Sequence, residues 1–241
     1  MTDKLRSIIF NLVYYGSTAI FCVLYIPTVF LPEKMYIKAL NFYFLYVAFI
    51  ERVFMNLRYE VIGREHLPKE GSYIVAAKHY SAYETLKLYV LFDHPAVILK
   101  KELFSIPIWG WLAKKAGNIG IDRSDRDSAV QSIKQGAIDT AKEGRPIVIF
   151  PQGTRVGINV KKPYKRGITH MAKAADLPII PLAMNSGVFW PRNAFWKKSG
   201  VVTFKFLPPI PKNIPADDII RRLETDLEQE SHALVESAKK L

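Results

Sequence analysis

A stretch of 26 consecutive residues without a charged side chain, residues 7–32, lies near the start of this 241-residue chain. As a helix it would measure about 39 Å, and bilayer hydrocarbon is roughly 30 Å thick, so the stretch is long enough to cross a membrane. A second apolar stretch, residues 39–50, follows after only three charged residues. We therefore expect residues 1–56 to form an apolar helical hairpin that acts as a membrane anchor.

Two other interpretations of this hairpin stay open. One is a secretory signal peptide, although the stretch is longer than such peptides and no small-residue cleavage site closes it. The other is a buried core hairpin of a soluble protein. Basic residues flank the hairpin on both outer sides, an arrangement that favours two ends in the cytoplasm and places the rest of the chain on the cytoplasmic side of the inner (cell) membrane. They are Lys4, Arg6, Arg52, Arg58 and Arg64.

The charge balance indicates a polyanionic partner. Lys and Arg number 34 against 22 Asp and Glu, for a net charge of +12, which suits an anionic membrane or phosphorylated substrates. No zinc-finger spacing, RNA-binding aromatic motif or long basic run indicates nucleic acid, so we expect no such partner. The single cysteine, Cys22, can form no intrachain disulfide. Phosphate-binding loops and metal-ligand motifs are also missing, so we expect no metal and no cofactor.

From residue 58 onward, short apolar runs alternate with amphipathic segments, as in a layered α/β domain. We predict that residues 57–241 form a mixed sheet flanked by helices. The expected strands are residues 58–62, 73–77, 95–99, 118–121, 146–150, 179–183 and 201–206. The expected helices are residues 82–92, 102–116, 124–143 (capped by Ser124), 167–176 and a charged amphipathic helix from residue 215 onward.

Two polar motifs each follow an apolar strand. His79, with Glu84 five residues later, follows residues 73–77, and the sequence Phe-Pro-Gln-Gly-Thr-Arg at residues 150–155 ends the run 146–150. Sites in open α/β sheets lie just past the carboxyl ends of strands. A histidine can take a proton from a hydroxyl near neutral pH, and a glycine turn beside arginine can receive a phosphate. Together the motifs predict a site that activates a hydroxyl next to a bound phosphate.

His79 and Glu84 can touch only if one of them lies outside a helix. Five residues apart on one helix, their side chains would point about 140° apart. We expect Ser81 to be the N-cap, which leaves His79 in the loop and Glu84 in the first helical turn. The same residues also fit a capping box in which Glu84 simply binds the amide of Ser81. The local sequence allows either role.

At these residues the chain resembles the lysophospholipid acyltransferase family, whose best-known members are 1-acyl-glycerol-3-phosphate acyltransferases. The resemblance covers roughly residues 58–210 and rests on four blocks in the family's order: residues 78–84, Gly-Asn-Ile-Gly-Ile-Asp-Arg at 117–123, residues 150–155, and Leu-Pro-Ile-Ile-Pro-Leu at 177–182. Two positions depart from the family pattern. This chain has Glu84 where the family normally carries Asp, and Gln152 where it carries Glu.

The resemblance implies an enzyme of phospholipid biosynthesis. It would move a fatty acyl group from an acyl thioester, carried by coenzyme A or by acyl-carrier protein, to the free hydroxyl of 1-acyl-glycerol-3-phosphate, giving phosphatidic acid. His79 would be the general base and Glu84 its partner. The residues expected to bind substrate are Arg155, Arg123, Gly153, Thr154, Gln152 and Lys101, with Lys165 as a further candidate.

Gln152 leaves two alternatives open. Because glutamine has no negative charge, one alternative is an O-acyltransferase whose acceptor is a different lysolipid, such as a bacterial aminolipid. The second alternative is a non-catalytic membrane protein that binds anionic lipid, in which Glu84 serves only as a helix cap.

Overall fold

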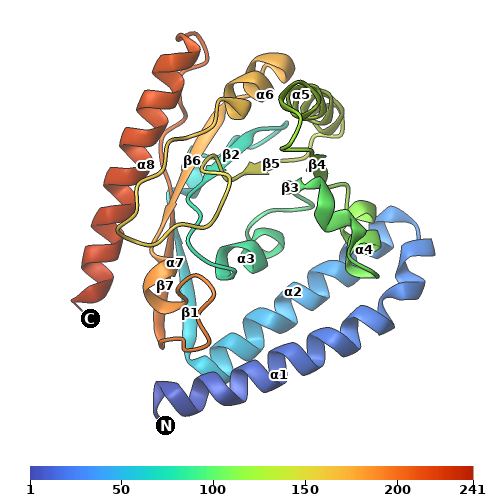
Figure 1. Cartoon of the computed structure of the whole chain (residues 1–241), viewed down its shortest axis with the longest axis vertical. Coiled ribbons are helices and arrows are strands. Elements are labelled where there is room, and N and C mark those ends of the chain that lie inside the picture. The colour runs from blue at the N-terminus through green and yellow to red at the C-terminus, as the bar shows by residue number, and fades with distance from the viewer. Residues whose placement is uncertain (241) are drawn as a thin grey trace.

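The computed structural model describes residues 1–240 and is built on a seven-stranded sheet with the strand order β1-β7-β6-β2-β5-β3-β4 (Figure 1). β7 runs antiparallel to β6, and the other neighbouring strands are parallel. The sheet is therefore mixed, as predicted. Its strands are β1 Leu57–Ile62, β2 Ile74–Ala77, β3 Ala96–Lys100, β4 Ile119–Ile121, β5 Ile147–Ile149, β6 Ile179–Met184 and β7 Gly200–Phe206.

Each strand lies within one residue of its predicted bounds. Every residue of the central strands β2, β5 and β6 is buried. Strands covered on both faces read as continuous apolar runs, and this is why the sequence shows them so clearly.

Two hydrophobic cores cover the two faces of the sheet. One core contains residues of α5 (Arg126–Lys142), α6 (Gly167–Ala175) and α8 (Ala216–Lys239). The other contains residues of the N-terminal hairpin, of α3 (Tyr83–Leu91) and of α4 (Trp109–Lys115). Alternate residues of one strand face opposite cores, as Ile74 and Val75 of β2 do.

Three local predictions were wrong. Residues 102–116 are not one helix: a 3-10 turn, η3 (Lys101–Ser105), precedes α4, and Pro107 between them disfavours a continuous helix. The cap of α5 is Asp125, whose carboxylate accepts the amides of the following turn at 3.0 and 3.1 Å. Ser124 instead bonds Asp122. A short helix, α7 (Ser186–Phe189), was not predicted at all.

The N-terminal hairpin consists of α1 (Asp3–Leu24), a 3-10 turn η1 (Ile26–Phe30) and α2 (Glu33–Met55). α2 lies between α1 and the rest of the protein (Figure 1). Within residues 1–240, α1 is the one helix that is long and apolar enough to cross a membrane, and only 17% of its apolar window is buried. A buried core helix would be mostly covered, so this exposure favours membrane association over the core-hairpin interpretation.

α2 packs firmly against the α/β part. Tyr36, Val47 and Met55 are fully buried, and the Tyr36 hydroxyl donates to the carbonyl of Leu112 at 2.5 Å. α2 ends at Met55 and β1 begins at Leu57, so the structure changes character at the expected boundary. The division into an anchor, residues 1–56, and a catalytic domain, residues 57–241, stays a prediction, because the two parts share one core.

Candidate active site

The two polar motifs meet because β2 and β5 are parallel neighbours, with Val75 opposite Val148. The backbone N–H of His79 donates to Oε1 of Gln152 at 3.2 Å, and the N–H of Val156 donates to the carbonyl of His79 at 2.9 Å. The imidazole of His79 also stacks on the ring of Phe150, with 3.9 Å between ring centroids. The loops after the two strands therefore form one site.

Glu84 is fully buried and serves both roles that the sequence left open. Its Oε1 accepts from Nδ1 of His79 at 2.9 Å and from the backbone amides of Tyr80 and Ser81 at 2.7 and 2.6 Å. The Ser81 hydroxyl in turn accepts the N–H of Tyr83, where α3 begins, at 3.0 Å. One carboxylate thus binds the backbone just before α3, whose N-cap is Ala82 and not the predicted Ser81, and also holds the imidazole.

A serine that the sequence analysis missed completes this arrangement. The hydroxyl of Ser186, at the start of α7, donates to Oε2 of Glu84 at 2.8 Å from a position 102 residues away in the chain. No motif surrounds Ser186, so only the fold reveals it. With Glu84 as acceptor, the neutral imidazole carries its proton on Nδ1, and Nε2 keeps a lone pair. Nε2 of His79 can therefore accept a proton, and His79 lines the adjacent cleft.

Lys78, the residue before His79, fixes the loop from the other side. Its side chain is 1% exposed and pairs with Glu228 of α8. The hydroxyl of Tyr164 donates to the same carboxylate at 2.9 Å. Burial lowers the pKa of Lys78, and Glu228 opposes that shift. The loop that carries His79 is thus held to the sheet, to α3 and to α8.

The cleft beside His79 has a volume of about 650 Å³. Its apolar wall comes from β3, β4, β5 and α5, and includes Ile98, Ile121, Val130, Ile133 and Ile149. Among the described residues, 1–240, none of those lining the cleft is aspartate or glutamate, whereas seven are cationic: Lys100, Arg123, Arg126, Arg155, Lys165, Arg166 and Arg192. A cleft with this lining suits a molecule with an anionic head and a hydrocarbon part.

The glycine turn at this cleft requires glycine. Gly153 has φ of +71°, and a Cβ there would lie 2.9 Å from Cε of Lys165. The carbonyl of Gly153 accepts from the guanidinium of Arg123, which brings Arg123 and Lys165 to the same turn. Burial lowers the pKa of Lys165, and Arg123 is the next largest cause. A bound anion would relieve this repulsion. Thr154 and Arg155 also line the cleft.

Two predicted substrate-binding residues do not line the cleft. The Lys101 side chain is 68% exposed, and its ammonium lies 4.0 Å from Asp122; the adjacent Lys100 lines the cleft instead. Gln152 is fully buried. Its carbonyl oxygen faces the N–H of His79, and its Nε2 has no hydrogen-bond partner within residues 1–240. Gln152 therefore bonds the histidine loop, and its role in binding the acceptor stays a prediction.

The sequence analysis also missed several basic residues of the cleft: Lys100, Arg126, Arg166, His170 and Arg192. They come from separate segments without a shared motif, so no local pattern indicated them. Burial lowers the pKa of His170, helped by the neighbouring cations Lys134 and Arg126. The cation-rich lining therefore extends from the glycine turn to the beginning of α5 and α6.

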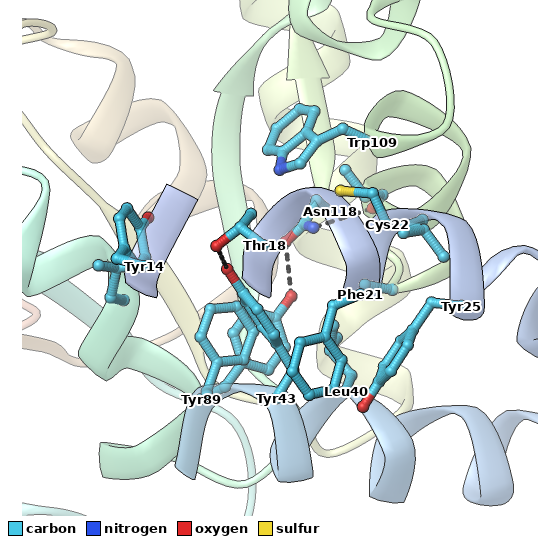
Figure 2. Close-up of a pocket in the computed structure, with 15 residues that line it drawn as sticks. Tyr14, Thr18, Phe21, Cys22, Tyr25, Leu40, Tyr43, Tyr89, Trp109 and Asn118 are labelled. Carbon is cyan, nitrogen blue, oxygen red and sulfur yellow. Dashed lines mark hydrogen bonds between the residues drawn. The ribbon is translucent and has the colours of Figure 1, made fainter. Parts of the chain in front are cut away.

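A second cavity, of about 190 Å³, lies between the hairpin and helices α3 and α4 (Figure 2). Two pairs of its polar groups bond each other: Thr18 with the Tyr43 hydroxyl at 3.0 Å, and the Tyr89 hydroxyl with Asn118 at 3.2 Å. The remaining surface is aromatic and aliphatic, so it suits a hydrocarbon group. α3 contributes Tyr89 to this cavity and Thr85 to the basic cleft.

Comparison with known proteins identifies the family of this chain. Residues 58–185 match the model of the family described as Acyltransferase. The chain belongs to the acyltransferase family. Its predicted resemblance is thereby confirmed, and the matched range contains His79, Glu84 and residues 150–155.

Several curated relatives carry the name 1-acyl-sn-glycerol-3-phosphate acyltransferase. The chain is 33% identical over 157 residues to 1-acyl-sn-glycerol-3-phosphate acyltransferase of Pseudomonas aeruginosa, covering 65% of this chain and 61% of that protein. It is 33% identical over 153 residues to the enzyme of that name from Limnanthes alba, covering 63% and 54%. The chain thus spans less than two thirds of the length of these two relatives. With the human alpha enzyme, identity is 28% over 216 residues, covering 87% and 75%.

A solved structure shows the same fold. The crystal structure of 1-acyl-sn-glycerophosphate acyltransferase from Thermotoga maritima matches with a TM-score of 0.77 over 97% of this chain and 98% of that one, at 21% identity. This match confirms the predicted α/β architecture together with the N-terminal helices. Within residues 1–240, no three His, Cys, Asp or Glu side chains are grouped to hold a metal ion; the expectation of no metal and no cofactor stays a prediction.

Proposed function

We propose that this protein is an acyltransferase that moves a fatty acyl group from an acyl thioester to the free hydroxyl of 1-acyl-glycerol-3-phosphate, giving phosphatidic acid. One observation carries the proposal: the His79–Glu84 pair opens on a cleft that is lined by cations and backed by an apolar wall. The acceptor has the same two parts, a phosphate and an acyl chain. The names of the relatives support this choice of acceptor.

The reaction would be a direct transfer with His79 as general base. Nε2 of His79 takes the proton of the acceptor hydroxyl while the hydroxyl oxygen attacks the thioester carbonyl carbon. The carbon–sulfur bond then breaks, and the departing thiolate takes the proton from the imidazolium. Glu84 stabilises the charged ring through its bond to Nδ1. No covalent acyl-enzyme forms, and no metal or cofactor takes part.

Arg155, Arg123 and Lys165 would bind the acceptor phosphate at the glycine turn. Arginine can hold two phosphate oxygens at once, and the left-handed Gly153 lets the backbone approach closely. The apolar wall of the cleft and the aromatic cavity beyond α3 offer hydrocarbon surface for the acyl chains. The remaining cations, around Arg126 and Arg166, are available for the phosphates of the thioester carrier. Either coenzyme A or acyl-carrier protein would supply such phosphate.

The exposed apolar surface of α1 supports association of the protein with a membrane. We propose that the catalytic part lies on the cytoplasmic side of the inner (cell) membrane, where thioester donors are made. The basic residues on both outer flanks of the hairpin support this side.

The direct test is acyl transfer by the purified protein with lysophosphatidic acid and either donor, comparing the wild type with His79→Ala. We expect His79→Ala to lower kcat by about 10² to 10⁴-fold, the usual contribution of a general base, with little change in thermal stability. His232→Ala is the matched control, because His232 is exposed on α8 away from the cleft. If His79→Ala keeps more than about a tenth of the wild-type activity, the general-base role is wrong.

An acceptor panel separates the alternatives. A strong preference for an uncharged or amino-containing lysolipid would favour the alternative acceptor. If the wild type binds lysophosphatidic acid but transfers no acyl group from any donor, the protein is a non-catalytic lipid binder.

A further inference from the structure

Residues 190–199, between α7 and β7, carry two large aromatic side chains outward. Phe195 and Trp196 are 53% and 50% exposed, and their rings meet edge to face with centroids 4.8 Å apart. Neither ring belongs to a core. Neighbouring exposed aromatic rings mark an interaction surface more often than isolated ones do.

The backbone of residues 190–199 is bound firmly to α1. Lys197 is 2% exposed, its N–H donates to the Ser7 hydroxyl at 2.9 Å, and its ammonium donates to Oδ1 of Asn11 at 2.6 Å. Asn11 also donates to the carbonyl of Phe195 at 3.0 Å. The ammonium of Lys197 lies 4.5 Å from the Trp190 ring centroid. The exposed rings therefore stand on a fixed base and not on a loose loop.

The same part of α1 exposes an apolar stripe on its outer side. Ser7 and Asn11 face the loop, whereas Leu5, Ile8, Leu12 and Tyr15 are between 40% and 71% exposed. These four positions fall on one face of the helix. The stripe and the two aromatic rings are thus held together at the N-terminal end of α1, which Figure 1 shows beside the loop before β7.

Positively charged side chains near the two rings indicate what this surface binds. Arg192 and Lys198 are exposed in the same segment, and Lys4 is exposed on α1. Aromatic rings next to Lys and Arg are the composition of segments that lie in the headgroup region of a bilayer, where the rings sit among the upper acyl carbons and the cations meet lipid phosphate. A surface of this composition fits an anionic phospholipid bilayer.

The segment also touches the cleft. The guanidinium of Arg192 donates to the carbonyl of Arg155 at 3.0 Å, and Arg192 and Asn193 line the cleft itself. The aromatic rings are three and four residues further along the chain. A lipid surface that holds the rings therefore lies close to the mouth of the cleft.

We propose that residues 190–199 form a second membrane-contacting element, in which Phe195 and Trp196 enter the interfacial region of an anionic bilayer while Arg192 and Lys198 bind its phosphates. This contact holds the mouth of the cleft at the lipid surface, so that a lysolipid reaches His79 without leaving the bilayer. The lipid contact is independent of the proposed function, and its consequence for lysolipid entry rests on that function.

A label at residue 196 tests the contact. In a Cys22→Ser background, Trp196→Cys is labelled with a polarity-sensitive fluorophore, and the protein is bound to vesicles of phosphatidylglycerol and phosphatidylethanolamine. Thr225→Cys, exposed on α8, is the matched control. We expect nitroxide lipids to quench the label at residue 196 and not the label at residue 225. Equal, solvent-like signals from both labels on vesicle-bound protein would overturn the proposal. It would also be overturned if residues 190–199 were found to be covered by another copy of the protein.

An activity test then examines lysolipid entry in the full chain. We expect the double variant Phe195→Ser, Trp196→Ser to raise KM for vesicle-borne lysophosphatidic acid about tenfold, while kcat for a water-soluble short-chain acceptor stays unchanged. Val160→Ser, at an equally exposed apolar residue, is the control. An unchanged KM would refute the role in lysolipid entry. If the wild type shows no acyl transfer at all yet the label at residue 196 is quenched, the proposed function fails and the membrane contact stands.

Discussion

Replacing Glu51 by Gln should destabilise the protein more than any other single change of one charged group in the hairpin. Glu51 of α2 and Lys87 of α3 form an ion pair in which both side chains are 1% exposed. Burial lowers the pKa of Lys87, and Glu51 opposes that shift. Glu51→Gln removes the carboxylate and leaves the charge of Lys87 over two aromatic rings, those of Tyr83 and Tyr59, whose centroids lie 4.5 and 5.9 Å away.

The size of this effect follows from the burial. Breaking a fully buried ion pair by removing one partner costs about 3 to 5 kcal/mol. For a chain of this length each kcal/mol lowers Tm by about 2 to 4 °C, so we expect a fall of roughly 6 to 20 °C. The double variant Glu51→Leu, Lys87→Met should recover most of the loss, because apolar side chains of similar volume need no charge partner.

Thermal unfolding in detergent micelles, followed by circular dichroism, measures both variants against the wild type. A loss below about 1 kcal/mol for Glu51→Gln, or a double variant less stable than the single one, would refute the reasoning. The same pair makes deletion of the hairpin informative. If the hairpin is an anchor, removing residues 1–50 should release the protein from membranes and expose apolar surface. Since the deletion exposes Lys87 and the core around α3, we now expect an aggregating, inactive product.

Three further predictions concern single side chains. Arg155→Ala should raise KM for lysophosphatidic acid about 10- to 100-fold and leave KM for the donor unchanged, whereas Lys101→Ala should change neither. Gln152→Leu should cost about 1 to 3 kcal/mol of stability and lower kcat, because it strands the N–H of His79; a rise confined to acceptor KM would place Gln152 at the substrate instead. Burial lowers the pKa of Lys197 to about 8. In the unfolded state the pKa of this lysine is near 10.4. Between about pH 8 and pH 10 the unfolded state therefore binds more protons than the folded state, so the free energy of unfolding of the wild type should rise relative to that of Lys197→Met as pH goes from about 8 to about 10. Urea unfolding across that range checks the sign.

The sequence predicted the sheet well because its central strands are buried on both faces and stay apolar throughout, as in Ile147–Ile149. It also allowed His79 and Glu84 to meet, because a helix that starts after Ser81 leaves His79 in the loop; α3 starts there, with Ala82 as its N-cap. Both inferences depend on residues within a few positions of each other. Pro107 shows where this kind of prediction fails, since the apolar pattern continues across it while the helix does not.

Long-range partners were beyond the sequence. Ser186 reaches Glu84 from 102 residues away, and Glu228 reaches Lys78 from 150 residues away. A lone serine or glutamate on a charged helix has no local signature. The direction of Gln152 was equally hidden, since a motif fixes the place of a residue in a turn and not which side of the turn its side chain takes.

Glu84 shows why a departure from a family pattern need not change the chemistry. Glutamate is one methylene longer than aspartate and has one more rotatable bond, so by itself it would hold the imidazole less firmly. Here four donors fix the carboxylate: Nδ1 of His79 and two backbone amides at Oε1, and the Ser186 hydroxyl at Oε2. Three of these donors belong to the loop that carries the histidine, and the fourth comes from α7. The position of the charge is thus set by the surrounding fold and not by the length of the side chain that carries it.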